Sequence, residues 1–183
     1  MKIKTTVRFV FACSVILFLS GSSSTLHAQG PEGKEFGFGL ILGEPTGGTI
    51  KYWVNPENAL VADIGYSYFG APRIDLDYVW HFHAFNSNVV KLYGALGGAV
   101  GFGNGYYGVF YKRGKYYVIS DDAPFYYRSY YNSDVGFGVR AMFGLNIIPR
   151  RTPLELFLEA GPLIGISPFG VAFDLAVGVR FYP

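Results

Sequence analysis

The stretch VGFGVRAMFGL, residues 135–145, shows most clearly how the chain is built. Its odd positions are all apolar, while its even positions hold three glycines, Arg140 and Met142. Successive side chains of a β-strand point to opposite faces of a sheet. This stretch therefore predicts a strand with one large apolar face and one face of small residues interrupted by a charge.

The same alternation recurs in seven other segments, separated by turns rich in Gly, Pro, Asn and Ser. These segments are residues 36–43, 49–54, 60–68, 74–83, 90–102, 154–159 and 173–181. Tilted strands of about 9–11 residues can cross a bilayer, and a sheet connected only by hairpins loses its open edges by closing on itself. The pattern predicts an all-β fold, an eight-stranded antiparallel up-and-down transmembrane β-barrel. Because Pro162 cannot donate to a ladder, we expect a bulge or an end to regular pairing near Gly161 and Pro162.

The N-terminus has the order of a secretory signal peptide. Lys2, Lys4 and Arg8 precede an apolar run over residues 9–19, which is shorter than the roughly 20 residues of a membrane-spanning helix. A Ser/Gly stretch then leads to a small-residue cleavage site that ends at Ala28. The predicted organisation is a signal peptide over residues 1–28 and a barrel domain over residues 29–183, with a long extracellular loop at about 103–134.

Composition narrows the function classes once this peptide is set aside. The formal charge of +2 loses three positive residues, which leaves 12 Lys and Arg against 13 Asp and Glu, or −1. Nucleic-acid binding then has no electrostatic support. The one cysteine, Cys13, lies in the signal segment, so the remaining chain offers no disulfide, thiol nucleophile or Cys-ligated metal.

The composition of the polar face favours a membrane barrel over a soluble one. That face combines Gly, Ala and Ser with isolated charges, which is short of Lys and Glu for a water-facing surface but suits the narrow interior of eight strands. The apolar face then contacts lipid. Aromatic residues near the strand ends predict two girdles at the membrane boundaries, one of Phe36, Trp80, Phe82 and Phe181, the other of Tyr66, Tyr68, Phe102, Phe137 and Phe173.

With this architecture the chain resembles the small outer-membrane β-barrels of Gram-negative-type bacteria, such as OmpX and the transmembrane domain of OmpA. The first hairpin, residues 37–47 followed by Lys51-Tyr52-Trp53, is similar to a family of small, mostly uncharacterised outer-membrane barrels. The resemblance implies an outer-membrane location and recognition by the outer-membrane insertion machinery. The last strand is similar to the assembly signal of these barrels, here Phe173, Leu175, Val177, Val179, Phe181 and Tyr182.

Ionisable side chains on the predicted inner face form the first candidate site. In a narrow interior such groups must be paired, because isolated burial costs several kcal/mol. We expect a structural salt-bridge network, and the alternative is a gated polar path or a proton- or cation-sensitive site around Asp75, Asp77, His81 and His83. The two histidines share a face, yet no third metal ligand is evident, so a packed, hydrogen-bonded pair is expected. The full set is Lys51, Asp63, Asp75, Asp77, His81, His83, Lys91, Arg140, Glu155, Glu159, Asp174 and Arg180.

The long third extracellular loop forms the second candidate site. Nine of the 15 tyrosines fall in it, and Tyr, Arg and Lys are typical of recognition surfaces. The alternative is that these tyrosines pack on each other at the headgroup boundary. The proposed surface consists of Tyr106, Tyr107, Tyr111, Lys112, Arg113, Lys115, Tyr116, Tyr117, Tyr126, Tyr127, Arg128, Tyr130 and Tyr131.

The sequence thus predicts an outer-membrane barrel with a largely filled lumen and a structural or adhesive role through this loop. A small or gated pore is the first alternative, and an outer-membrane lipid-modifying enzyme and a soluble periplasmic carrier barrel are further ones. We expect no enzymatic activity, cofactor or metal, since no nucleophile and base pair together. The expected partners are outer-membrane lipid and lipopolysaccharide, whose phosphates the basic loop residues would meet, the insertion machinery, and an extracellular ligand.

Overall fold

The computed structural model describes residues 30–83, 85, 87, 89–103, 135–149, 151–167 and 169–183. No helix in these ranges is long and apolar enough to cross a membrane. The elements follow the order η1 (Pro31–Gly33), β1 (Phe36–Gly43), β2 (Thr46–Trp53), β3 (Asn58–Ser67), β4 (Gly70–His83), β5 (Val90–Phe102), β6 (Val135–Ile147), β7 (Leu154–Ser167) and β8 (Phe169–Phe181).

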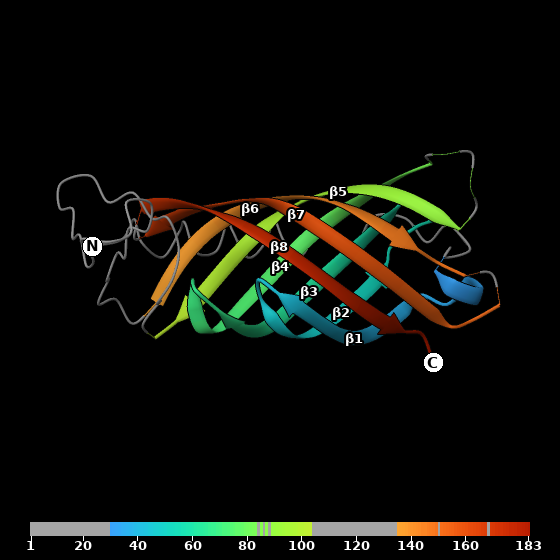
Figure 1. Ribbon diagram of the computed structural model, residues 1–183, viewed down its shortest axis with the longest axis horizontal. Coiled ribbons are helices and arrows are strands. Elements are labelled where there is room, and N and C mark those ends of the chain that lie inside the picture. The colour runs from blue at the N-terminus through green and yellow to red at the C-terminus, as the bar shows by residue number, and fades with distance from the viewer. Residues whose placement is uncertain are drawn as a thin grey trace, which may run out of the picture.

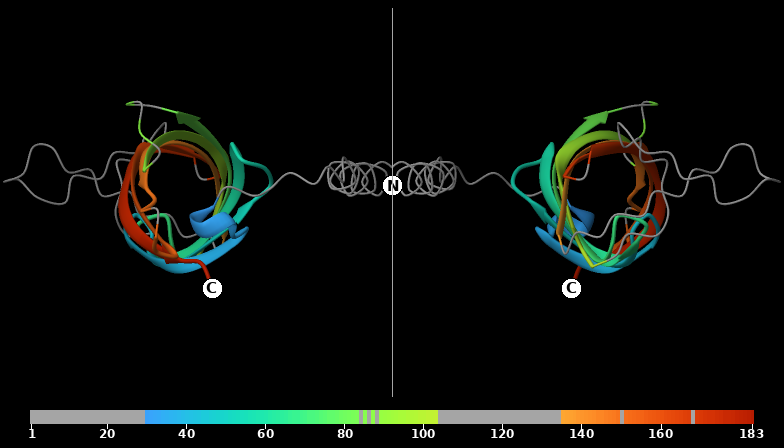
Figure 2. Two further views of the ribbon diagram at one scale, coloured as in Figure 1. Left: turned by 90° about the vertical axis from the view of Figure 1, so that its right-hand side faces the viewer. Right: turned by 90° about the vertical axis from the view of Figure 1, so that its left-hand side faces the viewer.

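The eight strands form one closed antiparallel barrel in sequence order. Each strand pairs with its neighbours along the chain, and β1 closes the barrel against β8 through the pairs Phe38↔Phe181 to Gly43↔Ala176. The strands lie steeply tilted around a long cylinder in Figure 1, and Figure 2 shows the ring they form when viewed along that cylinder. The predicted eight-stranded up-and-down barrel is confirmed.

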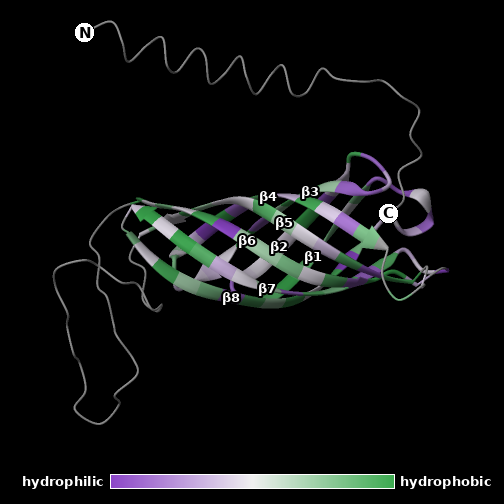
Figure 3. Cartoon of the chain, turned by 90° about the horizontal axis from the view of Figure 1, so that it is seen from above, coloured by the Kyte–Doolittle hydropathy of each residue, from purple (hydrophilic) through white to green (hydrophobic). Residues whose placement is uncertain are grey.

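The alternation in the sequence becomes an inner and an outer face. In β8 every second residue is exposed, from Phe169 to Phe181, and all but one of the residues between them are buried. Figure 3 shows the resulting alternation of hydrophobic and hydrophilic bands along the strands. The barrel therefore has its apolar side chains outside and its polar side chains inside, the reverse of a water-soluble protein.

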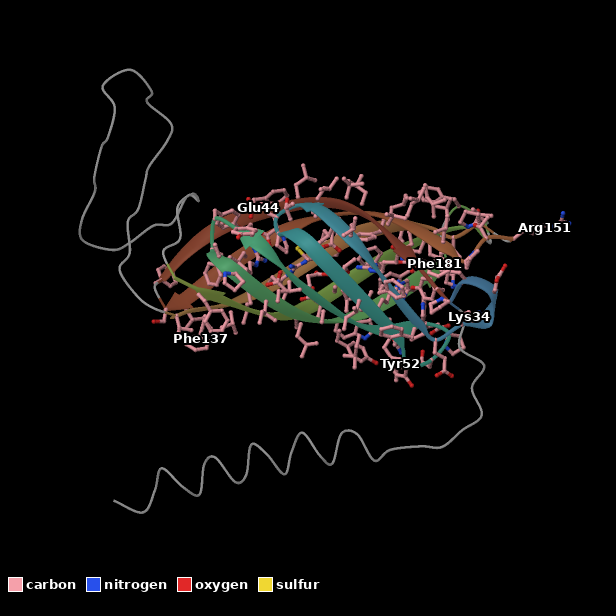
Figure 4. All side chains as sticks on the ribbon, turned by 90° about the horizontal axis from the view of Figure 1, so that it is seen from below. Lys34, Glu44, Tyr52, Phe137, Arg151 and Phe181 are labelled. Atoms are coloured by element: carbon pink, nitrogen blue, oxygen red, sulfur yellow. The ribbon has the colours of Figure 1, made fainter. Side chains whose placement is uncertain are left out.

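The two ends of the barrel carry different parts of the chain. The terminal end holds η1, the C-terminus and the turns after β2, β4 and β6, whereas the loop end holds the connections after β1, β3, β5 and β7. Figure 4 shows Lys34 and Phe181 at the terminal end and Glu44 and Phe137 at the loop end. Lys34 Nζ donates to the carbonyl oxygen of Pro183 at 2.5 Å, which joins the start of the barrel to its last residue.

The fourth strand is longer than the sequence predicted. Gly70-Ala71-Pro72 reads as a turn, yet β4 begins at Gly70 rather than at residue 74. The pairing between β3 and β4 shifts between the pairs Gly65↔Arg73 and Ser67↔Gly70. Pro72 lies within this irregularity, where a residue without an N–H does least damage to the ladder. The strand consequently brings Arg73, which the sequence analysis did not select, onto the inner face.

Of the two outcomes expected at Gly161 and Pro162, a bulge is absent, but regular pairing is interrupted there on one side of the strand. The pairing of β7 with β8 continues through Pro162↔Phe173. On its other edge β7 pairs with β6, and there neither residue has a described partner. The pairs on either side of this gap, Arg140↔Leu163 and Phe143↔Ala160, keep the same register, so no residue has been inserted. The actual shift lies toward the loop end, between Phe137↔Ser167 and Gly138↔Gly165. Pro162 thus interrupts the ladder on one edge without adding a residue to the strand.

The predicted aromatic girdles need one correction. Eight of the nine residues are exposed on the outer face. Tyr68 instead lies at the β3–β4 turn with its side chain buried inside the barrel. The strict alternation of β3 ends at Ser67, so the rule that successive side chains face opposite sides of the sheet no longer predicts the direction of the Tyr68 side chain.

Candidate functional site in the barrel interior

The residues predicted to line the lumen are brought together inside the barrel. Eleven of the twelve are buried, and the side chain of the twelfth, His83, lies outside the described part of the structure. Neighbouring strands in the closed sheet present their inner faces to a common space, so side chains far apart in the sequence meet there. They form three clusters along the barrel axis.

The terminal-end cluster is built around the carboxylate of Glu155, which is completely buried. Its Oε1 accepts from Lys51 Nζ and from Arg180 Nη1, each at 2.9 Å. Its Oε2 accepts from the Tyr182 hydroxyl at 2.5 Å, and that hydroxyl accepts from Trp53 Nε1 at 3.2 Å. One carboxylate therefore organises two cations and two aromatic side chains at this end.

The same cluster fixes the orientation of His81. Its Nε2 lies 3.0 Å from Lys51 Nζ and 3.1 Å from Asn146 Nδ2. An ammonium and an amide NH₂ are donors only, so Nε2 accepts and the ring proton lies on Nδ1, which donates to the Glu57 carbonyl oxygen at 3.0 Å. The ring also packs at 4.3 Å, centroid to centroid, against Trp53. His81 is therefore committed to internal contacts rather than to a ligand.

The middle cluster reverses this balance, because one guanidinium faces several carboxylates. Arg140 bonds Asp75 through Nη1 and Glu159 through Nη2, the latter at 2.9 Å. Its Nε lies 3.3 Å from Asp77 Oδ2, and its Nη1 lies 4.0 Å from Asp63 Oδ2. All five side chains are buried. Four acids thus face one guanidinium in the middle of the barrel.

The loop-end cluster is built on Arg73. Its Nε donates to Asp75 at 2.8 Å and its Nη2 to Asp174 at 2.6 Å, while its Nη1 donates to the Ser67 hydroxyl at 3.1 Å. The Tyr68 hydroxyl also donates to Asp174. Asp75 is shared with Arg140, so this cluster and the middle cluster form one continuous network.

Three interior residues of these clusters were not predicted to lie there: Arg73, Tyr182 and Tyr68. The sequence contained a signal for the first two. Arg73 stands two positions before Asp75, so continuing the alternation of that segment backward places it on the inner face. Tyr182 follows the outward Phe181, and the same parity turns it inward. In the predicted assembly signal, the five alternating residues from Phe173 to Phe181 are exposed, and Tyr182, which stands beside that row, is buried. No comparable signal indicated Tyr68.

Three titratable groups lie just beyond the strand ends. Burial raises the pKa of Glu44 from its ordinary value of 4.5, against the opposing effect of hydrogen bonds from the Ser67 hydroxyl and the Tyr68 backbone N–H. Burial, reinforced by a neighbouring carboxylate, raises the pKa of Tyr68 beside Asp174 and of Tyr182 beside Glu155. Both phenols therefore stay protonated and act as donors to those carboxylates.

Two further candidates stand differently. Within the described ranges, no three His, Asp or Glu side chains are grouped so that they could hold a metal ion. All the loop residues proposed as a binding surface, from Tyr106 to Tyr131, lie outside the described residues. Their role stays a prediction.

Comparison with known proteins agrees with the fold. No family model matches the sequence, and no curated protein matches it. Among solved structures, the N-terminal β-barrel domain of Pseudomonas aeruginosa OprF is similar, with a TM-score of 0.54 and 15% sequence identity. The match covers 84% of this chain and 98% of that one. At this identity the likeness establishes a shared small eight-stranded barrel architecture.

Proposed function

We propose that the protein is an integral outer-membrane barrel with a closed interior, and that it acts as a structural or surface-interaction protein through the long loop at about 103–134. One observation carries the membrane location. Every Asp, Glu, Lys and Arg that lies within a described strand is buried inside the barrel. The outer face is apolar on all eight strands, with side chains such as Leu40, Phe143 and Phe173 exposed by 64%, 71% and 66%. Such a surface needs a hydrocarbon solvent.

Spin labelling tests this location. After cleavage at the predicted site the chain has no cysteine, so single cysteines at Leu96 and Phe143 on the outer face can be labelled, with Arg151 in the exposed β6–β7 turn as the matched control. In lipid vesicles we expect the two strand labels to collide readily with oxygen and poorly with a water-soluble nickel chelate, and the turn label to show the reverse. Equal nickel access at all three positions would refute the membrane assignment and favour a soluble carrier.

The three clusters support a closed lumen. Arg73, Arg140 and Arg180 project inward at successive levels, and each is held by carboxylates from other strands. Phe157 lies beneath Arg180, whose guanidinium carbon is 3.8 Å from the ring centroid. An eight-stranded barrel has an interior that side chains can fill. We therefore propose that these side chains maintain the barrel rather than line a permanently open pore.

A small or gated pore is the second candidate, favoured by the polar side chains that lie at successive levels of the interior, in three clusters. Conductance separates the two functions. A closed barrel inserted in a planar bilayer passes no steady current, whereas a pore gives steady open events whose size changes when Arg140 is replaced. We propose no catalytic activity, and unchanged lipid A mass spectra on overexpression would agree with that.

Surface interaction is assigned to the Tyr-rich loop. Deleting residues 106–131 removes its nine tyrosines, and all eight strands of the closed barrel lie outside the deleted range. We expect the truncated protein to keep the heat-modifiable migration of a folded barrel and to lose binding to cells, matrix or lipopolysaccharide, whose phosphates would meet Lys112, Arg113, Lys115 and Arg128. If binding of the full protein persists after the deletion, the loop does not carry it.

A further inference from the structure

The middle and loop-end clusters contain more negative charge than their cations can neutralise. Among the described residues, the carboxylates that pair with Arg73 and Arg140 are five: Asp63, Asp75, Asp77, Glu159 and Asp174. Two guanidinium groups face these five acids, and Asp75 contacts both of them. In a low-dielectric interior such an excess is costly, because each unpaired charge has lost its hydration.

Of these five carboxylates, Asp63 has the weakest contacts with positively charged groups and hydrogen-bond donors. Its side chain is 2% exposed, and neither carboxylate oxygen has a described hydrogen bond of good geometry. The Thr49 hydroxyl, which lies opposite Asp63 in the strand register, faces the carboxylate as a donor. Its cation contact is Arg140 Nη1 at 4.0 Å, and that nitrogen also bonds Asp75. By contrast, Asp75 and Asp174 each accept from a guanidinium at hydrogen-bonding distance.

The strand register places Asp63 directly opposite Asp75 on the inner face. Side chains of directly opposed residues on neighbouring strands are about 5 Å apart at Cβ, and like charges there repel. Lys51 and Arg180, which approach from β2 and β8, are bonded to Glu155, and Arg180 also donates to Thr49. The charged or titratable groups that face Asp63 from the strands around it are Lys51, Asp75, Asp77, Tyr93, Arg140, Glu159 and Arg180.

We propose that Asp63 is an internal proton-binding site, occupied at neutral pH. As the barrel closes, the carboxylate takes one proton from a hydronium ion of the solvent: an O–H bond of the hydronium ion breaks, an O–H bond to Asp63 forms, and a water molecule and a neutral carboxylic acid result. Two carboxylates held close together cannot both ionise without a large penalty, and one proton removes it. The acid also gains a donor, which an ionised carboxylate lacks.

A proton suits this position better than a bound metal ion. A hard cation such as Ca²⁺ requires about six to eight oxygen ligands, whereas a proton needs a single carboxylate oxygen. The other acids of the cluster are committed to Arg140, Arg73 or Tyr93, the last through its hydroxyl to Glu159 at 2.6 Å. Asp77 also makes no described hydrogen bond, but its Oδ2 lies 3.3 Å from Arg140 Nε, whereas the Asp63 carboxylate lies 4.0 Å from the same guanidinium.

Infrared spectroscopy of the folded protein in lipid vesicles tests the proposal. At pH 7 the wild type should show the C=O stretching band of a protonated carboxylic acid, and the band should shift when aspartate is labelled with ¹³C. Asp63→Asn should abolish the band, while the control Asp174→Asn, which changes a carboxylate paired with Arg73, should keep it. No such band in the wild type at pH 7, or a band that persists in Asp63→Asn, would overturn the proposal.

Two further readouts keep the test decisive. Exchanging Na⁺ for K⁺ or adding a chelator should leave the band unchanged; a band that emerges only after metal removal would mean that a cation occupies the site, which also overturns the proposal. The amide of Asn resembles the neutral acid, so Asp63→Asn should fold and unfold in urea at no lower concentration than the wild type. A marked loss of stability would show that the protein needs the ionised carboxylate.

Discussion

The terminal-end and middle clusters both pair charged side chains in the interior of the barrel, but with opposite proportions of acids and bases. At the terminal end, Glu155 holds Lys51 and Arg180 at 2.9 Å each. In the middle, Arg140 is shared by four carboxylates at unequal distances. A group with no substitute near it should matter far more than one of several equivalent groups. We therefore expect the loss of stability on replacing a buried charged residue to depend on whether another residue of the same charge lies close enough to take its place, and not on its burial alone.

The largest effect is expected at Glu155. Glu155→Gln removes the counter-charge of Lys51 and Arg180 while keeping the shape of the side chain, and it leaves two buried cations with no described carboxylate partner. We expect a loss of about 3–5 kcal/mol in the free energy of unfolding, measured by urea titration in lipid vesicles. Glu32→Gln, on the exposed side of η1, is the control and should change little. Equal stability of the two variants would break the comparison.

Replacing Arg140 ranks second. Arg140→Leu removes the cation that four acids share, yet those acids can take up protons in place of the guanidinium. We expect a loss of about 2–3 kcal/mol at pH 7, the scale of hydrogen bonds to charged groups, with part of it recovered in acid. Glu155→Gln cannot recover in this way, since lysine and arginine do not lose their charge in acid. Urea titrations at pH 5 and pH 7 compare the two variants. If Arg140→Leu loses the same stability at both pH values, the carboxylates around Arg140 do not take up protons in its place, which contradicts the account.

The absence of a side chain at Gly97 leaves room for Asp77 to approach Arg140. Gly97 lies on β5 between Asp77 and Arg140 in the register, and a Cβ atom there would lie 2.0 Å from Asp77 Oδ1 and 2.2 Å from the Leu76 carbonyl oxygen. Gly97→Ala must therefore displace Asp77 or the backbone, at a cost of about 1–3 kcal/mol.

The neighbouring glycine provides the matched control. A Cβ atom on Gly98 would have its nearest atom at 3.7 Å, so Gly98→Ala should stay within about 0.5 kcal/mol of the wild type. Urea midpoints of both variants measure the difference. If the two substitutions cost the same, the inner wall at β5 is not as close to Asp77 as the structure indicates.

The smallest effect is expected at Glu44, which lies outside both clusters and is half-buried. Burial raises its pKa above 4.5, so the folded barrel holds this proton more tightly than the unfolded chain. The contribution is complete below the ordinary pKa and is lost as the pH rises through the folded value. Glu44→Gln should therefore flatten the decline of stability over that window, seen in urea midpoints from pH 4 to pH 8. An unchanged slope would remove Glu44 from the pH response.

The sequence was sufficient for the architecture because alternation is a local property. The segment around Arg140 alternates without a break, so the inner position of that side chain followed directly. Tyr68 could not be placed, because the β3–β4 turn interrupts the parity. Pairing could not be predicted either: Glu155 meets Lys51 only because the sheet closes between β8 and β1, which places β7 and β2 around one interior. The surplus of acids beside Arg140 likewise depends on register, which alternation leaves undetermined.

Ion flux through the folded protein tests the central claim, a membrane barrel whose interior is filled, most directly. Wild-type protein is reconstituted into dye-loaded vesicles, and insertion is verified by heat-modifiable migration and by protection of the strands from protease. The account predicts no more ion leakage than protein-free vesicles show, because Arg73, Arg140 and Arg180 with their carboxylates occupy successive levels of the lumen. Leakage that rises in proportion to the inserted protein would contradict it.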